Sequence, residues 1–525
     1  MIEYKKYLGE FKKMADKVVE KILLNYGLFC EHIPYCFSTE TLSKHIYELK
    51  PQIMGLKKTN SFPLNFTMSK NAVLRRTISI PNIILYLKLL FYYEENWNTI
   101  LSKYTTKNSE SSIKSLTNSV YKQKYSKSIR ARIQKFAGYK VKLNVDISNC
   151  FDSIYTHSIT WALCGKEEAK KCFKDKNYGD ASLRGIYDIA DNIDKKTRAL
   201  NGNQTNGILT GPYSSYIFSE IIFNEIDSLL SGKKKDFVFT RYRDDFSFYF
   251  LDKDKIDSSI QEIAKIFKEY NLYINQEKIK VEYFPYDLLD DYDSIFSSMI
   301  ENKDYSALLN KSLNLYNQGQ KGAVKYAFNL LKDIEELEIS SLYLLDLILS
   351  VIINMPEISY LGVKLLEKGA NYVFVQGLYK RLNQLLTEEL IQEHYHECMW
   401  IMYLITRFNV QIELSNVKRV LSSENDILIV MCLDYIQKNF SRVYSENKQT
   451  FNTLDDLVVA LSSEIDHISN ILRQEDYNGA HWLMAYEIPY NDFTLNKSID
   501  IHGLKKYNFY SFLSQKKISF YTKIS

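Results

Sequence analysis

Three aspartates, one of them about a hundred residues before an adjacent pair, have the residue type and surroundings that metal chemistry needs. Asp244 and Asp245 are adjacent within Phe237–Phe250 (FVFTRYRDDFSFYF), where two aromatic, strand-like runs flank the pair. Two carboxylates at the tip of a hydrophobic hairpin must lose water beside each other, which is unfavourable unless a cation compensates their charge. Hard oxygen ligands at this spacing favour Mg²⁺, so this stretch predicts a magnesium site.

Asp146 supplies the further carboxylate that a site with two metal ions requires. It ends the apolar, strand-like start of Leu143–Ile154 (LNVDISNCFDSI), and the backbone carbonyl of Ile147 follows directly. We therefore expect the three aspartates and this carbonyl to bind two Mg²⁺ ions, which Mn²⁺ can replace. Surface acids in two unrelated turns are the alternative, which the apolar and aromatic neighbours of these acids disfavour.

The elements that must position these acids follow a fixed order along the chain. The strand ending at Asp146 comes first, a glycine-containing turn and helix follow in Asn206–Ile221 (NGILTGPYSSYIFSEI), and the acidic hairpin comes last. This order resembles motifs A, B and C of a polymerase palm, and Tyr-x-Asp-Asp resembles motif C of reverse transcriptases. SIYTHSITWALCGKEEAK (residues 153–170) and QTNGILTGP (residues 204–212) are similar to the bacterial defence reverse transcriptases of the abortive-infection and unknown groups.

The resemblance implies a fold and a reaction. The fold is α+β, with reverse-transcriptase fingers and a palm built on an antiparallel sheet, followed by an all-α, HEAT-like helical-repeat domain in place of a thumb. The reaction is DNA synthesis from dNTPs, in which two metal ions activate a 3′-hydroxyl and stabilise the leaving pyrophosphate. The implied domains are residues 1–69 (N-terminal helices), 70–145 (fingers), 146–296 (palm, motifs A to D), 297–490 (helical repeats) and 491–525 (C-terminal tail).

The same resemblance assigns roles beside the metal site. Phe151, five residues after Asp146, corresponds to an aromatic residue that sits under the sugar and blocks a 2′-hydroxyl. It therefore predicts the use of dNTPs over NTPs, with simple core packing as the alternative. Gln204, Gly207 and Gly211 belong to the loop that opens the motif B helix, where glycines let the backbone approach the template or the nascent base.

Basic residues before and after the palm predict contacts with phosphate. Lys278, in a stretch that resembles motif D, would touch the triphosphate or protonate pyrophosphate, with a solvated lysine as the alternative. Arg75 and Arg76 lie in Lys70–Trp97, which resembles the first fingers motif and predicts a helix from about Asn82. Guanidinium groups match phosphate oxygens bidentately, and a solvated strand edge is the alternative for this pair.

A second basic segment leads directly into the first aspartate. Lys122–Lys142 is rich in Lys and Arg and contains no acid. Such a run is usually a solvated face, but its position before a metal site predicts a clamp for the triphosphate. In the resemblance it is the second fingers motif, from which we select Arg130, Arg132 and Lys135 as dNTP-binding residues.

The C-terminal half predicts helices and an ambiguous tail. From Ser297 to Glu487 apolar blocks alternate with short polar breaks, which is typical of stacked helix pairs without a strict repeat. Beyond Asp500 the tail has no acids, and its lysines alternate with aromatic residues. This composition is typical of a segment that binds single-stranded nucleic acid. The alternative is that the tail docks on the protein as an added edge strand.

Composition limits the class of protein. The 525 residues, with 46% apolar and 25% charged, predict an ordered chain of several domains. A net charge of +4 restricts any nucleic-acid surface to a local patch. Seven cysteines without a CxxC pair indicate reduced thiols, and the acids and missing apolar run of the N-terminal segment predict no signal peptide. The most apolar run, Leu342–Ile353, is too short to span a bilayer, so we expect a cytoplasmic protein without membrane contact.

The leading hypothesis is a reverse transcriptase that acts in antiphage defence by abortive infection, either RNA-directed or template-independent. Its expected partners are dNTPs, a single-stranded DNA product, an associated RNA and further copies of itself in a homo-oligomer. A non-catalytic nucleic-acid-binding assembly that signals in phage defence is one alternative, and a retron- or intron-type reverse transcriptase is the other. Some relatives start DNA on one of their own tyrosines, and the sequence does not choose among Tyr4, Tyr7, Tyr26, Tyr35 and Tyr47.

Overall fold

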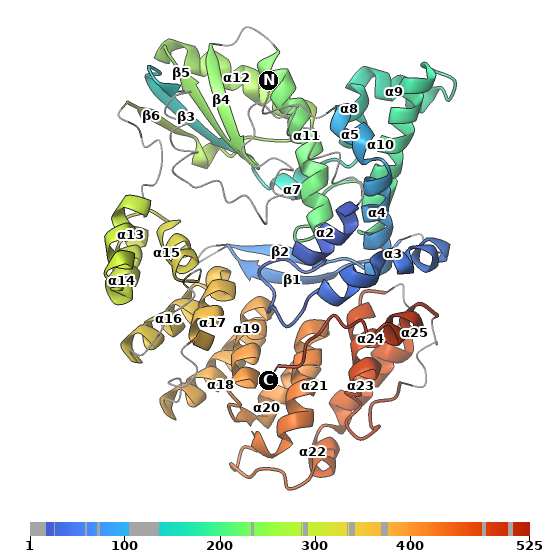
Figure 1. Ribbon diagram of the computed structural model, residues 1–525, viewed down its shortest axis with the longest axis vertical. Helices are drawn as coiled ribbons and strands as arrows, with labels where there is room; N and C mark the ends of the chain where they lie inside the picture. The colour runs from blue at the N-terminus through green and yellow to red at the C-terminus, as the bar shows by residue number, and fades with distance from the viewer. Residues whose placement is uncertain are drawn as a thin grey trace. The chain divides into compact units, whose positions relative to one another are not determined.

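The computed structural model describes most of the chain and divides it into two compact units. The described residues are 17–25, 27–57, 60–70, 74–103, 136–232, 236–284, 286, 292–332, 334, 342–368, 376–474, 479–501 and 508–524. The first unit takes in Met1–Leu28, Leu42–Pro63 and Ile80–Leu289, and the second takes in Phe29–Thr41, Leu64–Ser79 and Asp290–Ser525. Helices dominate both units, and the first also contains a four-stranded sheet (Figure 1). The α+β class predicted from the sequence is confirmed.

The sheet of the first unit is antiparallel throughout. Its strands are β3 (Val141–Asp146), β4 (Phe237–Tyr242), β5 (Asp245–Phe250) and β6 (Lys280–Tyr283), in the order β4-β5-β3-β6. Side chains of β3 alternate, because Leu143 and Val145 are 0% and 2% exposed whereas Asn144 and Asp146 are only partly buried. The sheet therefore has one apolar face and one polar face.

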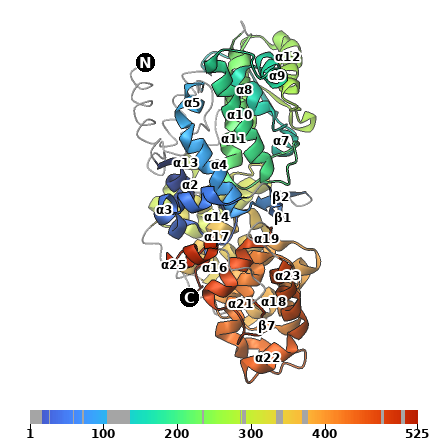
Figure 2. The same ribbon diagram turned by 90° about the vertical axis from the view of Figure 1, so that its right-hand side faces the viewer.

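Helices cover the apolar face of the sheet. The helices of the first unit are α2 (Val18–Asn25), most of α3 (Glu40–Gly55), α4 (Ile83–Glu95), α5 (Trp97–Ser102), α7 (Cys150–Ser153), α8 (Ser158–Cys164), α9 (Lys166–Lys174), α10 (Ala181–Ala199), α11 (Tyr213–Ser231) and α12 (Ile256–Glu269). Phe246 of β5 packs on Phe223 of α11 and Phe267 of α12, with ring centroids 6.2 and 5.0 Å apart. Helix α8 contacts both α10 and α11 (Figure 2).

Local signals explain where some of these helices begin. Asn82 precedes α4, and its side-chain oxygen accepts a hydrogen bond from the Ile84 amide at 3.1 Å. Asparagine is a favoured residue at this position because it satisfies an amide that has no partner inside the helix. The predicted start of the helix near Asn82 is therefore confirmed.

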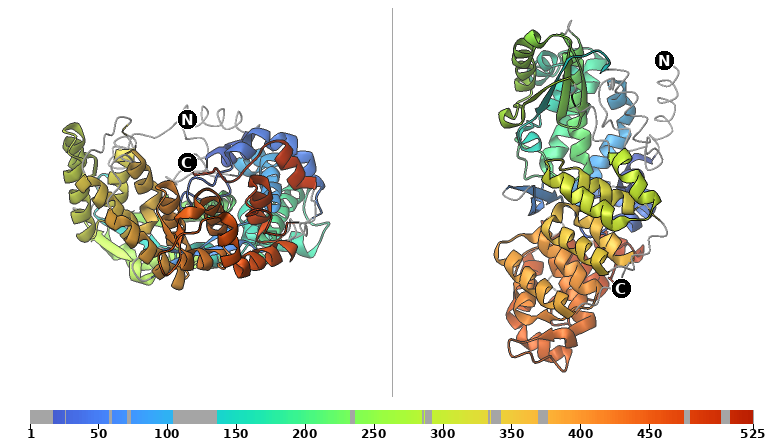
Figure 3. Two further views of the ribbon diagram at one scale, coloured as in Figure 1. Left: turned by 90° about the horizontal axis from the view of Figure 1, so that it is seen from below. Right: turned by 90° about the vertical axis from the view of Figure 1, so that its left-hand side faces the viewer.

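The second unit is an array of helices with two small two-stranded sheets. Its helices are α13 (Tyr292–Glu301), α14 (Tyr305–Asn317), α15 (Ala323–Lys332), α16 (Leu342–Asn354), α17 (Ser359–Lys368), α18 (Gln376–Ile391), α19 (Tyr395–Arg407), α20 (Leu414–Leu421), α21 (Asp426–Asn439), α22 (Leu454–Ala460), α23 (Ser462–Gln474), α24 (Trp482–Asn491) and α25 (Asn508–Gln515). Its strands are β1 (Leu64–Ser69), β2 (Arg75–Ile80), β7 (Ile412–Glu413) and β8 (Val443–Tyr444). Neighbouring helices pack in pairs, α14 on α15, α16 on α17 and α18 on α19, as a helical-repeat array predicts (Figure 3).

The C-terminal tail docks within the second unit. The Phe520 amide donates a hydrogen bond to Glu487 Oε1 at 2.7 Å, and the Tyr521 hydroxyl donates to Asp434 Oδ2 at 2.7 Å. Tyr521 also forms an antiparallel bridge with Phe37. Because Phe520 and Tyr521 are 1% and 2% exposed, these rings are not available to stack on bases. Of the two interpretations of the tail, docking on the protein is the one that these contacts favour.

No single helix in the described part of the chain is long and apolar enough to cross a membrane. One helix pair, Tyr343–Asn354 with Pro356–Lys368, reaches the required length and composition together but is bent by 112°.

Candidate active site

The acidic hairpin between β4 and β5 has a two-residue loop. Tyr242 pairs with Asp245, so Arg243 and Asp244 form the loop between the strands. Arg243 has a φ of 56°, in the left-handed region that the tight turns of β-hairpins require. The turn exposes Arg243 at the tip and directs two consecutive carboxylates to the end of the sheet.

Strand pairing brings the third aspartate to the same end of the sheet. Asp146, the last residue of β3, lies directly opposite Asp245, the first residue of β5. Directly opposed residues on neighbouring strands have Cβ atoms about 5 Å apart. The register therefore unites carboxylates that are separated by about a hundred positions in the sequence, as the motif order predicts.

Two of the three aspartates, Asp244 and Asp245, have raised pKa values. Burial, followed by the charges of Asp244 and Asp146, raises the pKa of the Asp245 carboxyl from 3.8 to about 6. A hydrogen bond between the carboxyl groups of Asp245 and Asp146 also favours the protonated form of Asp245. Burial and the charge of Asp146 likewise raise the pKa of Asp244. Burial first, and then the neighbouring anions, therefore disfavour the charged forms of Asp244 and Asp245.

Lys278 joins this group from the segment between α12 and β6. It ends the short 3₁₀ turn Gln276–Lys278, and its Nζ donates a hydrogen bond to Asp146 Oδ2 at 2.6 Å. This hydrogen bond raises the pKa of Lys278, so the ammonium form persists at neutral pH. Lys278 therefore brings an ammonium group to the three carboxylates, and its predicted contact with the triphosphate or pyrophosphate stays a prediction.

The donor atoms at this end of the sheet fit a hard divalent cation. Within the described ranges no three His, Cys, Asp or Glu side chains already surround a common point in metal-binding geometry. The oxygen-only donor set and the raised pKa values of Asp244 and Asp245 are nevertheless what carboxylates gathered to share a cation show in its absence. The residues present therefore fit Mg²⁺ by their chemistry.

The role of the Ile147 carbonyl as a further oxygen ligand stays a prediction. Ile147 forms an antiparallel bridge with Ile274. The hydrogen bonds of this bridge join the flanking residues, since the Asn275 amide donates to the Asp146 carbonyl at 2.8 Å. The bridge thus leaves the carbonyl of Ile147 itself unused, as in any pair of this kind.

The motif B loop packs against the segment that carries Phe151. The Gly207 amide donates to the Ile154 carbonyl at 2.9 Å, and the Ile208 amide donates to the Phe151 carbonyl at 2.9 Å. Gly207 has a φ of +83°, and a Cβ there would lie 3.3 Å from the Asp152 carbonyl oxygen. Glycine is therefore required by both the backbone angle and the close approach. The predicted sugar-blocking residue and the predicted template loop are neighbours.

Gln204 and Gly211, the other two residues predicted to act here, lie near the two ends of the loop. Gln204 is exposed, and its backbone amide donates to the Asn201 carbonyl at 3.0 Å. Gly211 has a φ of +125° and is followed by Pro212, which immediately precedes α11. Their roles in binding the template or dNTP stay predictions.

The predicted phosphate-binding arginines of the first fingers motif belong to the second unit. Arg75 Nη1 and Nη2 donate to the two Glu397 carboxylate oxygens at 2.8 and 2.6 Å, and its Nε donates to Thr67 Oγ1 at 2.9 Å. Arg75 thus has a structural ion pair that the sequence did not indicate. Arg76 is exposed. Phosphate binding by these two residues stays a prediction.

The predicted triphosphate clamp, Arg130, Arg132 and Lys135, lies outside the described residues. The described chain resumes at Phe136, whose ring stacks on Tyr249 of β5 with centroids 3.7 Å apart and an interplanar angle of 12°. The end of the basic segment is therefore attached to the sheet, and the clamp itself stays a prediction.

A buried ionic cluster beneath the hairpin was not predicted. Arg241 of β4 is 1% exposed and pairs with Glu220 and Asp227 of α11. The signal in the sequence is an arginine at an inward position of an aromatic strand, together with two acids seven residues apart on an otherwise apolar helix.

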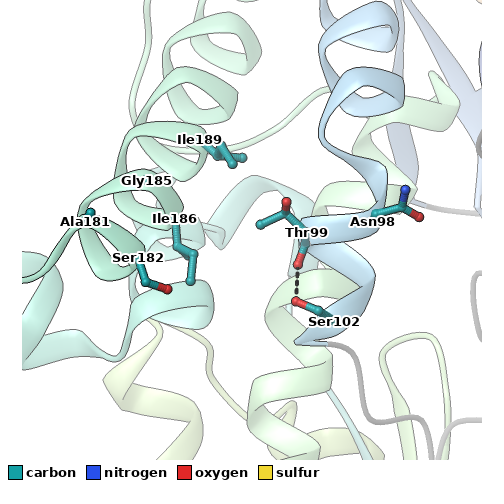
Figure 4. Close-up of a pocket in the computed structure, with 8 residues that line it drawn as sticks. All are labelled: Asn98, Thr99, Ser102, Ala181, Ser182, Gly185, Ile186 and Ile189. Atoms are coloured by element: carbon teal, nitrogen blue, oxygen red, sulfur yellow. Dashed lines mark hydrogen bonds between the residues drawn. The ribbon is translucent and has the colours of Figure 1, made fainter.

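A separate hollow lies between α5 and α10 (Figure 4). It has a volume of ≈ 510 Å³ and is lined by Asn98, Thr99, Ser102, Ala181, Ser182, Gly185, Ile186 and Ile189. None of the three aspartates lines it, and the Ser102 hydroxyl is already engaged with the Thr99 carbonyl at 2.7 Å. We assign no chemistry to this hollow.

An antiparallel sheet with an acidic hairpin tip beside an acidic strand end defines the palm of a nucleic-acid polymerase. Residues 95–365 match the family model described as reverse transcriptase (RNA-dependent DNA polymerase). The chain belongs to this family of nucleotidyltransferases. Reverse transcriptases generally use divalent metal ions and bind nucleic acid.

Solved telomerase structures are also similar to the chain, at low identity. Apo telomerase from Candida tropicalis lacking its C-terminal domain is 15% identical with a TM-score of 0.28, over 48% of this chain and 56% of the other. Telomerase from Candida albicans in complex with a TWJ fragment of telomeric RNA is 14% identical with a TM-score of 0.25, over 69% and 68%. The chain thus spans little more than half of the first of these proteins. No curated protein is significantly similar to the chain.

Proposed function

We propose that Asp146, Asp244 and Asp245 bind two Mg²⁺ ions and that the protein adds dNTPs to a DNA 3′ end under the direction of an RNA template. The observation that carries this proposal is the register that sets Asp146 opposite Asp245 at the hairpin tip. When bound, the two ions supply the positive charge that activates a 3′-hydroxyl and stabilises the leaving pyrophosphate.

The protein's own groups orient the substrate and move a proton. Lys278 is an ammonium group beside Asp146, so it can donate a proton to pyrophosphate as that group leaves. The Ile208 amide holds the backbone carbonyl of Phe151 against the motif B loop, which supports the placement of Phe151 beside the sugar, where its ring would exclude a 2′-hydroxyl. Gly207 brings a backbone turn close to the backbone of Asp152, next to Phe151, without a side chain in the way.

A polymerisation assay with purified protein tests the proposal. We expect incorporation of labelled dNTPs on an RNA template with a DNA primer in the presence of Mg²⁺ or Mn²⁺, and little incorporation of NTPs. Asp244→Asn is the matched inactive variant, because it removes one charge and keeps the side-chain volume. Incorporation by Asp244→Asn at the wild-type rate, or equal use of NTPs, would contradict the proposal.

We propose further that the protein acts in antiphage defence as a cytoplasmic homo-oligomer. The similarity of residues 153–170 and 204–212 to defence reverse transcriptases supports this role, and the helical second unit offers surface for self-association. Cells carrying the wild-type protein should resist phage, and cells carrying Asp244→Asn should not. A monomer in light scattering would count against the oligomer.

We also propose that the first nucleotide of the DNA is joined to a tyrosine of the chain, in place of a separate primer. The Tyr47 hydroxyl donates to Glu94 Oε1 at 2.7 Å and is partly exposed, whereas Tyr35 accepts a hydrogen bond from Tyr403 at 2.8 Å. Mass spectrometry of the expressed protein should detect a nucleotide adduct on one tyrosine, and an unmodified chain would refute this route. Three candidates lie outside the described residues: Tyr4, Tyr7 and Tyr26.

A further inference from the structure

Arg241 is a charged residue on the buried face of the palm sheet. It follows Phe237 and Phe239 at two-residue spacing along β4, so its side chain belongs to the apolar face. Its guanidinium lies over the rings of Phe223 and Phe246, at 5.0 and 6.0 Å from their centroids. A charge in these surroundings requires fixed protein partners, because water cannot solvate it there.

Two buried carboxylates of α11 hold the guanidinium in one orientation. Glu220 and Asp227 are 0% and 4% exposed, and they are seven residues apart, which puts them on one side of the helix. Nη1 and Nη2 donate to the two oxygens of Glu220 at 2.9 and 3.2 Å, and Nε donates to Asp227 Oδ1 at 3.0 Å. Paired hydrogen bonds of this kind fix the plane of the guanidinium as well as its position.

The same guanidinium reaches the tip of the acidic hairpin. Arg241 Nη1 donates a hydrogen bond to the Arg243 carbonyl oxygen at 2.9 Å. That carbonyl belongs to the peptide plane that joins Arg243 to Asp244, so holding it restricts the backbone from which the Asp244 side chain departs. Arg243 is in the left-handed region, with a φ of 56°, which is unfavourable for a residue with a side chain unless its surroundings hold it there.

We propose that Arg241 is a positioning residue for catalysis: it ties the hairpin tip to α11 and so fixes Asp244 and Asp245 relative to Asp146. The inference rests on the proposed role of these aspartates. Because α11 follows the loop that contains Gly207, the same cluster also links the hairpin tip to the element expected to contact the template.

A positioning role and a purely stabilising role predict different effects when the ionic cluster is replaced. A buried charged cluster can be replaced by apolar residues of similar volume with little loss of stability, whereas removal of one partner is strongly destabilising. If Arg241 only stabilises the first unit, an apolar replacement of the whole cluster restores both folding and catalysis. If it positions the tip, such a replacement restores folding alone.

The experiment compares three forms of the full-length protein with the wild type. The first is Arg241→Lys, and the second is the triple variant Arg241→Met, Glu220→Met and Asp227→Leu. The third, Arg198→Met, is a matched control because it removes a partner of the buried Asp194 on α10, at 3.2 Å, without touching the hairpin. Hydrogen exchange of the peptide spanning Val238–Phe250, Mn²⁺ affinity by electron paramagnetic resonance, and dNTP incorporation are measured on the folded fraction of each.

We expect the triple variant to melt near the wild-type temperature. Its tip amides should exchange about 10- to 100-fold faster, because that is the range expected for loss of a hydrogen bond from a charged donor. Its Mn²⁺ affinity and kcat should fall by about the same factor, while Arg198→Met changes the melting temperature but not the exchange at the tip. Exchange at the tip, Mn²⁺ affinity and kcat within about twofold of wild type in a folded triple variant would overturn the proposal.

Two further measurements distinguish a failure of the positioning role of Arg241 from a failure of the proposed metal site. If the variants fail to fold, hydrogen exchange of the wild-type protein tests the proposal. Amides of the hairpin tip that exchange as fast as those of an exposed loop would overturn the positioning role of Arg241. Asp245→Asn serves as the reference for the aspartates. Full incorporation by Asp245→Asn would refute the proposed metal site, whereas loss of incorporation there with a fully active Arg241→Lys and triple variant would refute only the positioning role.

Discussion

Replacing Asp245 with asparagine should stabilise the metal-free protein while it abolishes activity. Burial, Asp244 and Asp146 raise the pKa of Asp245 from 3.8 to about 6, so the ionised form is disfavoured in the folded state. Without solvent screening, a rise in pKa of this size would lower the free energy of unfolding by ~3 kcal/mol at neutral pH. Because Asp245 is more than a third exposed, solvent screening reduces the expected effect to about 1 kcal/mol. Asparagine keeps the volume and removes the charge.

The pH dependence of this effect has a definite sign. The folded chain binds a proton at Asp245 more tightly than the unfolded chain does, so the stability of the wild type falls as the pH rises from 3.8 to about 6. Above this window the penalty is constant. The advantage of Asp245→Asn should therefore be largest at pH 7.5 and shrink to about a third at pH 4.5.

Thermal melting in buffer with a chelator measures the difference. A change of about 1 kcal/mol moves the melting temperature of a unit of this size by about 2 °C. Added Mg²⁺ should raise the melting temperature of the wild type and leave Asp245→Asn less affected, because binding to the folded state is linked to stability. Asp257→Asn, an exposed acid on α12, is the control and should change stability by less than about 0.5 kcal/mol. An Asp245→Asn variant that is no more stable than wild type at pH 7.5 would refute the reasoning.

Three further substitutions test the surroundings of the aspartates. Gly207→Ala should lower incorporation by roughly tenfold or more, because its Cβ would lie 3.3 Å from the Asp152 carbonyl at a φ of +83°, whereas Gly185→Ala, which has open space, should not. Phe151→Val should increase NTP incorporation relative to dNTP, and an unchanged ratio in single-nucleotide assays would remove Phe151 from the sugar pocket. Lys278→Met should lower kcat more than it raises KM for dNTP, and the loss should be smallest at low pH; a change in KM alone would indicate binding instead of proton transfer.

The acids and their strands were predictable because their signals are local. An apolar strand that ends in Asp146 and a short aromatic hairpin around Asp244 leave few ways to pair antiparallel strands, since a slip of one residue would expose the apolar face. The register then follows from the hydrophobic pattern. Lys278 was predictable only through the resemblance to motif D, because a single lysine in a polar turn carries no signal of its own.

The buried partners of charged residues were not predictable in the same way. Arg241 and Glu220 meet only after the strand has packed on α11, and Arg75 meets Glu397 across more than three hundred positions. Nor does local patterning reveal that Phe29–Thr41 and Leu64–Ser79 belong with the C-terminal unit. These pairings depend on tertiary contacts, which hydrophobic periodicity does not encode.

The most direct test of the account is the position of the metal ions. Crystals of the protein with Mn²⁺ and a non-hydrolysable dNTP analogue should show two anomalous peaks, ligated by carboxylate oxygens of Asp146, Asp244 and Asp245. We also expect the triphosphate of the analogue to contact both ions. Anomalous peaks bound elsewhere in the chain, or an analogue bound away from these three aspartates, would contradict the central claim.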